Sequence, residues 1–304
     1  MCLCRDKIPP SITPTNLTRD LINSMTSIET LATDLDGTLI PLDDSPCYAE
    51  ALRSLKLYVQ EHQLQLLFIS GRSWQLIRNA IEEVDLPWPD AAICDVGTSI
   101  FVASDTRTSA GATDRRDYSH SEDYADCLRN ILSGWKAEDI LRQIDELDTA
   151  LWPQPDDCQS EFKISFFFEL DQQDSVCGKV QAWIDANQAP VSIVVSRQID
   201  GPLGLIDVLP KGVHKGFALK WWLEHHDIPL QGAVYCGDSG NDSAAMACGV
   251  NGVVVGNADQ HLRSAMEAEH PDNVYFAESK ATAGVLEGLI HFHQASDVRH
   301  SEVR

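Results

Sequence analysis

Short apolar runs alternate with amphipathic stretches along most of this chain, and this alternation constrains the fold more than any other feature. Residues 28–32 and LQLLFIS (64–70) are typical of buried strands, and WQLIRNAIEEV (74–84) follows the second run as a helix. Next come AAICDVGTSIFV (91–102), a strand and turn, and SEDYADCLRNILSGW (121–135), a helix. Strand–helix alternation of this kind predicts an α/β fold with a Rossmann-like parallel sheet, covered by helices on both faces.

The middle of the chain has a different pattern. FKISFFFEL (162–170) is an aromatic strand, and SVCGKVQAWIDAN (175–187) is a helix. SIVVSR (192–197) and LGLIDVLP (203–210) follow as two strands separated by a glycine-containing turn. The order strand, helix, strand, strand predicts an antiparallel α+β unit rather than a continuation of the parallel sheet.

The parallel pattern resumes after this unit, with HKGFALKWWLEHH (214–226), AVYCGDSG (233–240) and GVVVGNAD (252–259). A parallel core interrupted by one inserted domain explains this order most economically. We therefore predict a leader at residues 1–27 and a core formed by residues 28–107 together with 206–293. The insert occupies residues 108–205, and a tail follows at residues 294–304.

Composition limits the partners of such a chain. Its 304 residues carry 23 basic and 46 acidic side chains, a formal net charge of −23, which disfavours binding to nucleic acid or to an anionic membrane surface. No apolar run reaches the length of about 18 residues that a spanning helix needs, and the start, MCLCRDKIPPSITPTNLT, lacks the apolar core of a signal peptide. The nine cysteines are scattered without paired CxxC clusters, so we expect a reducing, cytoplasmic compartment.

Two carboxylates follow the first apolar run directly. TDLDGTL (33–39) places Asp34 and Asp36 before a glycine turn, at the carboxyl end of a strand, where α/β sheets bind their ligands. Asp34 is placed to act as a nucleophile or metal ligand, and Asp36 lies close enough to exchange protons. The string alone is also compatible with a plain turn, because Asp and Gly are common turn residues.

Two further positions favour an anionic ligand. Ser70 ends the strand at 64–70 and is followed by Gly71 and Arg72, so its hydroxyl and the nearby backbone N–H groups suit a phosphoryl oxygen, although a helix N-cap is an alternative role. Lys215 stands at the beginning of the helix at 214–226, where a cation opposes the helix dipole. A partner anion explains that placement, and Lys211 in the same loop is the competing candidate.

GDSGND (237–242) follows another apolar strand and adds Asp238 and Asp242. Together with Asp34 and Asp36, these carboxylates are expected along one edge of one sheet. Like charges a few ångströms apart repel strongly, so the site needs a counter-cation or must hold protons. Hard oxygen ligands suit Mg²⁺, and the ion together with Lys215 would supply the positive field that a chain of charge −23 otherwise denies a phosphate ester.

These strings resemble the four motifs of the haloacid dehalogenase superfamily of phosphohydrolases: DLDGT, then Ser70, Lys215 and GDSGND, in that order. The resemblance implies the haloacid dehalogenase fold, with the insert as an α+β cap domain of the second class. Six strings are similar to the sucrose-6-phosphate phosphatase family over residues 30–293: FISGRS, DVGTSI, FKISF, DVLPKGVHKG, CGDSGND and ATAGVLEGLIHF.

The resemblance also implies roles for individual residues. Asp34 would attack phosphorus and form an aspartyl-phosphate, while Asp36 would protonate the leaving sugar oxygen and then accept a proton from water. Ser70 and Lys215 would hold the transferring phosphoryl group. Mg²⁺ would be bound by four groups: the Asp34 carboxylate, the Asp36 backbone carbonyl, Asp238 and, directly or through water, Asp242.

The remaining substrate contacts are expected from the cap and from the second motif. Gly71 and Arg72 accompany Ser70, and Lys163 and Ser165 in FKISF would contact the sugar. Alternate residues of an edge strand can equally face solvent.

The sequence therefore predicts a Mg²⁺-dependent phosphatase whose substrate is a sugar phosphate, with sucrose 6-phosphate as the first candidate. Other candidates are a different sugar phosphatase, such as one for mannosylfructose phosphate, a phosphomutase of the same superfamily, and a non-catalytic sugar-binding module of a synthase. We further expect a monomer that associates with a sucrose-phosphate synthase.

Overall fold

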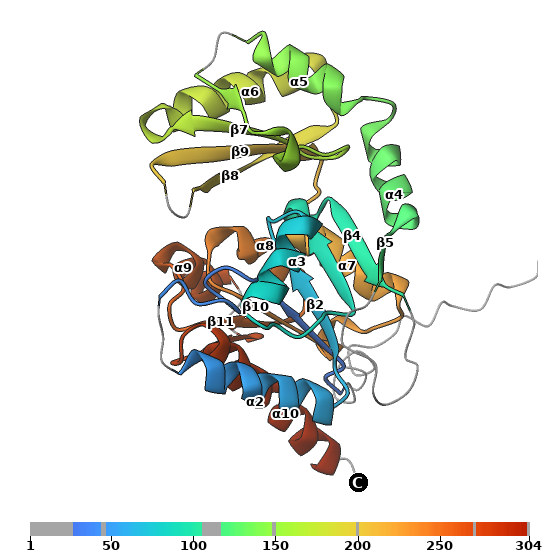
Figure 1. The fold of residues 1–304 in the computed structure, drawn as a ribbon, viewed down its shortest axis with the longest axis vertical. Helices are drawn as coiled ribbons and strands as arrows, with labels where there is room; N and C mark the ends of the chain where they lie inside the picture. Colours follow the sequence, from blue (N-terminus) through green and yellow to red (C-terminus); the bar gives the residue numbers. More distant parts are fainter. Residues whose placement is uncertain are drawn as a thin grey trace, which may run out of the picture.

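The computed structural model describes residues 27–43, 47–104, 117–147, 150–198, 201–269 and 272–302. Two separate sheets are present, one of eight strands in the order β12-β11-β10-β1-β2-β3-β4-β5 and one of four strands in the order β6-β7-β9-β8 (Figure 1). The predicted leader lies outside the described residues except for its last residue.

The larger sheet is parallel from β12 to β3 and antiparallel at the β3–β4 and β4–β5 pairs. β1 lies near its centre and pairs with β10 on one side and β2 on the other. The strands are β1 (Thr30–Thr33), β2 (Gln65–Ile69), β3 (Ala91–Cys94), β4 (Ser99–Ala103), β5 (Tyr118–His120), β10 (Ala233–Gly237), β11 (Asn251–Val254) and β12 (Val274–Phe276).

Helices cover both faces of this sheet, because its central strands are buried on both sides. Leu31, Phe68 and Val234 belong to one apolar cluster with side chains of α2 (Tyr48–Glu61), α3 (Trp74–Glu83) and α10 (Ala281–Glu302). The neighbouring Ala32 and Leu67 point to the other face and belong to a second cluster, which includes α7 (Lys215–His225), α8 (Ser243–Met246) and α9 (Gln260–Glu269). The predicted α/β core is confirmed.

The inserted unit carries the smaller, antiparallel sheet. Its strands are β6 (Trp152–Pro153), β7 (Ile164–Glu169), β8 (Val191–Arg197) and β9 (Leu203–Pro210), and its helices are α4 (Glu122–Leu132), α5 (Ala137–Asp145) and α6 (Gln173–Asn187). Ile164, Phe166 and Phe168 of β7 are buried on the side of α5 and α6, so the alternate residues of β7 face the larger sheet (Figure 1). This unit is the cap that the sequence predicted.

Strand pairing places the domain boundaries differently from the sequence at three points. β5 pairs with β4 in the larger sheet, although residues 118–120 fell inside the predicted insert. β9 pairs with β7 and β8 along its whole length, so residues 206–210 belong to the cap sheet rather than the core. α10 continues past residue 293 to Glu302, through most of the predicted tail. Among the described residues, no helix is both long and apolar enough to cross a membrane.

Candidate active site

Three adjacent strands deliver the first catalytic candidates to one edge of the sheet. β1 ends immediately before Asp34, β2 immediately before Ser70, and β10 immediately before Asp238. The Asp34 backbone N–H donates to the carbonyl of Cys236 at 2.9 Å, so the β1–β10 ladder continues to the site itself. The structure therefore brings together residues that lie up to about two hundred positions apart in the chain, as parallel pairing requires.

Lys215 is a buried cation between carboxylates. Its side chain is 1% exposed, and its Nζ donates to Asp34 Oδ1 at 3.0 Å, to Asp242 Oδ1 at 2.7 Å and to Asn241 Oδ1 at 3.0 Å. Lys215 begins α7, where three oxygen partners compensate a position that the helix dipole disfavours. Lys211, the alternative candidate, is exposed.

The acidic groups are short of positive charge. Burial raises the pKa of Asp34 to about 8, with Lys215 opposing the shift and Asp242 and Asp238 adding to it. Burial together with the Asp242 carboxylate raises the pKa of Asp238 to about 7. Burial alone would lower the pKa of Lys215, but Asp242 and Asp34 outweigh it and raise that pKa. One ammonium thus faces three carboxylates, an imbalance that protons or a cation must remove.

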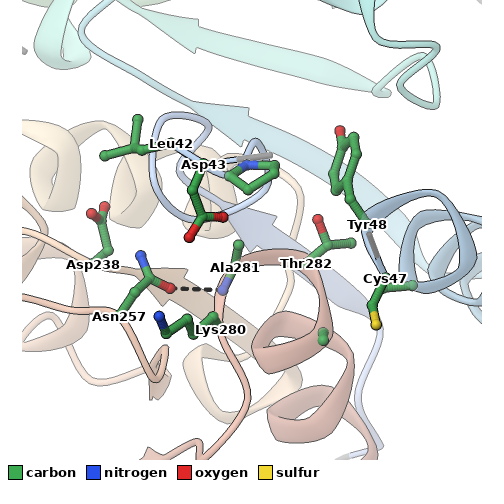
Figure 2. A pocket seen from close by; sticks show the side chains of 12 residues that line it. Leu42, Asp43, Cys47, Tyr48, Asp238, Asn257, Lys280, Ala281 and Thr282 are labelled. Atoms are coloured by element: carbon green, nitrogen blue, oxygen red, sulfur yellow. Dashed lines mark hydrogen bonds between the residues drawn. The ribbon is translucent and has the colours of Figure 1, made fainter. Parts of the chain in front are cut away.

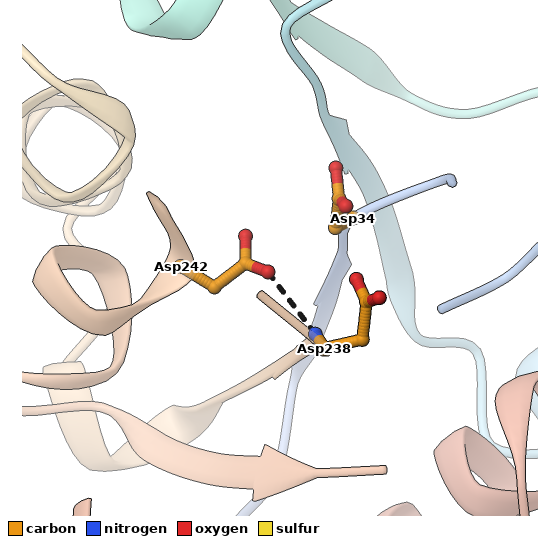
Figure 3. Close-up of side chains that lie close together, drawn as sticks. All are labelled: Asp34, Asp238 and Asp242. Carbon is orange, nitrogen blue, oxygen red and sulfur yellow. Dashed lines mark hydrogen bonds between the residues drawn. The ribbon is translucent and has the colours of Figure 1, made fainter. Parts of the chain in front are cut away.

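Those three carboxylates are grouped closely enough to bind one ion. Oxygen atoms of Asp34, Asp238 and Asp242 all lie within 4.8 Å of one another (Figure 3). Asp242 is fully buried, and each of its oxygens already accepts from the protein: Oδ1 from Lys215 and from Tyr235 OH at 2.6 Å, and Oδ2 from the backbone N–H groups of Asp238 and Ser239, each at 3.0 Å. Asp34 and Asp238 therefore present oxygens that are more available to an ion, whereas the Asp242 oxygens are already occupied by hydrogen bonds within the protein.

The loop after β1 approaches Asp238 very closely. Gly37 has φ +76°, and a Cβ at this position would stand 2.2 Å from Asp238 Oδ2, so both backbone conformation and space require glycine. The neighbouring Thr38 Oγ1 donates to Asp238 Oδ1 at 3.0 Å. The close approach of Gly37 in the first motif to Asp238 in the fourth motif explains why a glycine is needed at position 37.

A cavity of about 460 Å³ opens beside Asp238 (Figure 2). It lies between residues 41–43 and 47–51 on one side and residues 280–283 on the other. Asn257 connects loops at its edge by donating to the Gly37 carbonyl and accepting from the Ala281 N–H, both at 2.7 Å. Asp238 thus has access to solvent, whereas Asp242 has none. This access suits an ion that retains water ligands, as Mg²⁺ does.

Asp36 and Arg72 form a bidentate ion pair. Arg72 Nε donates to Asp36 Oδ2 at 2.8 Å, and Nη2 donates to Oδ1 at 2.5 Å. Both side chains stay partly exposed, at 20% for Asp36 and 32% for Arg72. A planar guanidinium fixes the orientation of a carboxylate, so Arg72, predicted as a substrate contact, orients the predicted acid–base residue.

Ser70 and Gly71 lie between β2 and α3, with Ser70 buried. The hydroxyl of Ser70 accepts from the Arg72 N–H at 3.2 Å, so it shapes this turn instead of capping a helix; Ser73 precedes α3.

The cap residues predicted to contact sugar are both buried. Lys163 Nζ forms an ion pair with Asp95 Oδ1 of the core at 3.1 Å, and Ser165 Oγ donates to Asp207 Oδ1 of β9 at 2.6 Å. Both side chains lie on the core-facing side of the cap sheet.

Sequence reasoning missed several supporting residues. Thr38 and Asn241 lie inside the motif strings, and their position close to an aspartate in the sequence could have indicated that they support the site. Tyr235 carries a hydroxyl in a strand that is otherwise apolar, and that hydroxyl contacts Asp242. Asp95 gave no such signal, because its partner Lys163 lies on a different domain.

The fold and the carboxylate–lysine site define a phosphatase of the haloacid dehalogenase type. A haloacid dehalogenase-like hydrolase from Bacillus subtilis has the same fold, with a TM-score of 0.63 and 18% identity, covering 88% of this chain and 92% of that protein. Residues 28–293 match the family model described as sucrose-6F-phosphate phosphohydrolase, and the chain belongs to that family.

Individual relatives agree with this assignment. The solved sucrose-phosphatase of Synechocystis sp. PCC6803, in complex with sucrose and phosphate, superimposes with a TM-score of 0.71 at 25% identity, covering 88% of this chain and 98% of that one. A mannosylfructose-phosphate phosphatase from Agrobacterium fabrum is 30% identical over 88% of this chain and 98% of its own length. A probable sucrose-phosphatase from Arabidopsis thaliana is 28% identical over 90% of this chain, which spans 61% of that protein.

Proposed function

We propose that this chain is a Mg²⁺-dependent phosphatase that hydrolyses a phosphorylated disaccharide, with sucrose 6-phosphate giving sucrose and phosphate as its reaction. The observation that carries the proposal is the buried Lys215–Asp34 pair beside Asp238, at the strand edge of a sucrose-6F-phosphate phosphohydrolase family member. A carboxylate nucleophile, a fixed cation and a second free carboxylate are what transfer of a phosphoryl group to a protein side chain needs.

The residues present fit a magnesium ion. Asp34 and Asp238 supply carboxylate oxygens, burial and the neighbouring Asp242 carboxylate raise the pKa of both groups, and the cavity beside Asp238 gives access to water. The Asp36 backbone carbonyl would complete the protein ligands, and Asp242 would act on them indirectly. When bound, the ion would neutralise charge on the phosphoryl oxygens.

In this mechanism the chain's own residues act in two stages. Asp34 attacks phosphorus to form the aspartyl-phosphate bond as the bond to the sugar oxygen breaks, and Asp36, which enters this stage in its protonated form, gives that oxygen its proton. Asp36 then takes a proton from a water molecule, which attacks phosphorus, releases phosphate and restores the Asp34 carboxylate. Arg72 keeps Asp36 oriented, while Lys215 and the Ser70–Gly71 turn hold the phosphoryl oxygens.

Substrate identity is proposed from the cap. Lys163 and Ser165 lie on the face of the cap sheet that is directed at the core, where the sugar would be bound. Each has one strong partner within the protein, yet a lysine ammonium has three donors and a serine hydroxyl can also accept, so both retain capacity for a sugar hydroxyl.

Mannosylfructose phosphate is the second candidate substrate. The Agrobacterium fabrum relative with that printed activity matches over nearly its whole length, whereas the Arabidopsis thaliana sucrose-phosphatase extends well beyond the matched region. A non-catalytic sugar-binding module is disfavoured by the presence of Asp34, Asp36, Lys215 and Asp238 together.

Three further properties stay predictions. The seven cysteines among the described residues are free thiols, which supports a reducing, cytoplasmic setting. Monomeric state and association with a sucrose-phosphate synthase follow from the family resemblance alone.

A panel assay tests the proposal. Purified protein with Mg²⁺ would be given sucrose 6-phosphate, mannosylfructose phosphate, glucose 6-phosphate and fructose 6-phosphate, without a bisphosphate activator, and free phosphate would be measured. We expect the highest kcat/KM with sucrose 6-phosphate and loss of turnover with EDTA. Preference for mannosylfructose phosphate would select the second candidate, and absence of phosphate release from every ester would reject the enzyme.

A further inference from the structure

One buried ion pair joins the cap to the core. Lys163 stands just before β7 of the cap, Asp95 follows β3 of the core, and their side chains are 7% and 9% exposed at a separation of 3.1 Å. Ser99 Oγ donates to the second Asp95 oxygen at 3.1 Å. Exposed ion pairs contribute little, but a pair this deeply buried fixes the geometry of both partners, because separating the charges inside the protein is costly.

Asp95 opens a short 3₁₀ segment, Asp95–Gly97, that we call the junction loop. Its backbone is bonded directly to the second motif: the Asp95 N–H donates to the Arg72 carbonyl at 3.0 Å, and the Val96 N–H donates to the Ser70 carbonyl at 3.1 Å. The residues that shape the phosphoryl pocket and orient Asp36 therefore depend on the position of this loop.

The junction loop also touches the third motif and a second part of the cap. A Cβ at Gly97 would stand 2.6 Å from the His214 carbonyl, next to Lys215, so the two backbones are in direct contact. The Gly97 carbonyl accepts from Tyr124 OH of α4 at 2.6 Å. One three-residue segment thus contacts two catalytic motifs and two cap elements.

The backbone of this loop is held in an unfavourable conformation. Asp95, Val96 and Gly97 have φ of 54°, 60° and 99°, and positive φ is especially rare for a β-branched residue such as Val96. For a residue other than glycine such a conformation is unfavourable and persists where the surroundings enforce it, often at functional sites. The contacts of Lys163 with Asp95 and of Tyr124 with Gly97 are the interactions by which the cap helps to hold this conformation.

We propose that the junction loop transmits the position of the cap to the catalytic residues, with Asp95 as a positioning residue held by Lys163. When the cap is seated, Lys163 holds Asp95, and the loop fixes Ser70 and Arg72 in the arrangement that places Asp36. When the cap lifts, the loop loses its cap partners and the second motif relaxes. The inference rests on the proposed function for its kinetic test only.

The kinetic test uses Asp95→Asn, Lys163→Met and the double variant, assayed with sucrose 6-phosphate and with p-nitrophenyl phosphate, which has no sugar for the cap to contact. Asparagine tolerates the left-handed conformation, so the first change removes charge and leaves the turn intact. We expect each single change to lower kcat at least about tenfold with both substrates, with KM for p-nitrophenyl phosphate unchanged and no further loss in the double variant.

The control is Glu161→Gln, which breaks the exposed Arg129–Glu161 pair within the cap, two residues from Lys163, and should leave kcat within twofold of the parent, as an exposed pair is worth little. Losses that multiply in the double variant would overturn the proposal. So would an effect of Lys163→Met confined to KM for the sugar phosphate, because that pattern describes a sugar contact.

Hydrogen–deuterium exchange tests the inference without any turnover. In Lys163→Met, a change in the cap, the Asp95 and Val96 amides of the core should exchange faster than in the parent, while the β1 amides stay protected. Unchanged exchange at these two amides would overturn the proposal whatever the activity. If the parent releases no phosphate from any ester, the proposed function fails, and exchange alone decides this inference.

Discussion

At the scale of single residues, the charge of Lys215 organises the site. Its ammonium is the only cation in direct contact with both Asp34 and Asp242 among the described residues. It compensates the Asp34 carboxylate in the resting protein and, in the proposed mechanism, would compensate phosphoryl oxygens during transfer. We therefore expect stability and catalysis to depend on the same ammonium group.

Lys215→Met should for that reason damage both properties. Removing one partner from a buried charged cluster costs about 3–5 kcal/mol, so we expect that loss in the free energy of unfolding at pH 7, measured by urea denaturation, together with loss of turnover. Lys211→Met, in the same loop but exposed, is the matched control and should stay within about 0.5 kcal/mol. Equal stability of the two variants would contradict the electrostatic account of the site.

At the scale of elements, the site depends on contact between the loops that follow β1 and β10. Asp34 and Asp238 come from adjacent parallel strands, and Gly37 allows the first loop to pass against the Asp238 carboxylate. The spacing of the two proposed metal ligands is thus set by sheet pairing and by the absence of a side chain at position 37.

Gly37→Ala should displace Asp238. We expect weaker Mg²⁺ binding, by roughly ten- to hundredfold as for other disturbed metal sites, measured by calorimetric titration. Gly134→Ala provides the control, because Gly134 also has positive φ, at +91°, but a Cβ there meets nothing within 4 Å. That variant should lose stability from backbone strain and keep its Mg²⁺ affinity; a loss of affinity in both would show that strain alone is responsible.

The core strands that end at the site were predictable because each one has a local signal. The apolar runs before Asp34, Ser70 and Asp238 mark strand ends, and parallel pairing then places those ends together. β5 was missed because its three residues, YSH, have no apolar alternation. The boundary at β9 was misplaced because an apolar strand does not indicate which of two sheets it joins.

The site was predictable only as far as its motifs reach. Contacts made within or between motif strings, such as Lys215 with Asp34, follow from the shared strand edge. The Arg72–Asp36 pair depends on the directions of two side chains, and the Asp95–Lys163 pair depends also on the position of the cap. No periodic pattern in the sequence indicates either of these. The left-handed conformation of Val96 runs against the preference of its own residue type, so no local rule indicates it.

At the scale of the whole molecule, the chain has a net charge of −23, and its proposed substrate is an anion. The raised pKa values of Asp34 and Asp238, about 8 and about 7, mean that the metal-free folded protein holds protons that the unfolded chain releases near pH 4. The folded state binds more protons across this window, so the free energy of unfolding decreases as pH rises from about 4 to 8.

Mg²⁺ should reverse this trend, because it replaces those protons. We expect the rise in Tm on adding Mg²⁺ to be larger at pH 8 than at pH 6. At a hundredfold excess of Mg²⁺ over its Kd, the free energy of unfolding should increase by about 2.7 kcal/mol. Differential scanning fluorimetry with EDTA as reference measures it, and Asp238→Asn should lose the shift. An equal rise in Tm at the two pH values would contradict the assignment of the carboxylates as ligands.

Chemical trapping can show whether Asp34 becomes phosphorylated during turnover. Sodium borohydride reduces an aspartyl-phosphate to homoserine, so protein quenched during steady-state hydrolysis of sucrose 6-phosphate with Mg²⁺ would be digested and sequenced by mass spectrometry. We expect homoserine at position 34 only when substrate and Mg²⁺ are both present, and no turnover in Asp34→Asn. Steady hydrolysis with unmodified Asp34 throughout, or normal turnover by Asp34→Asn, would contradict this expectation.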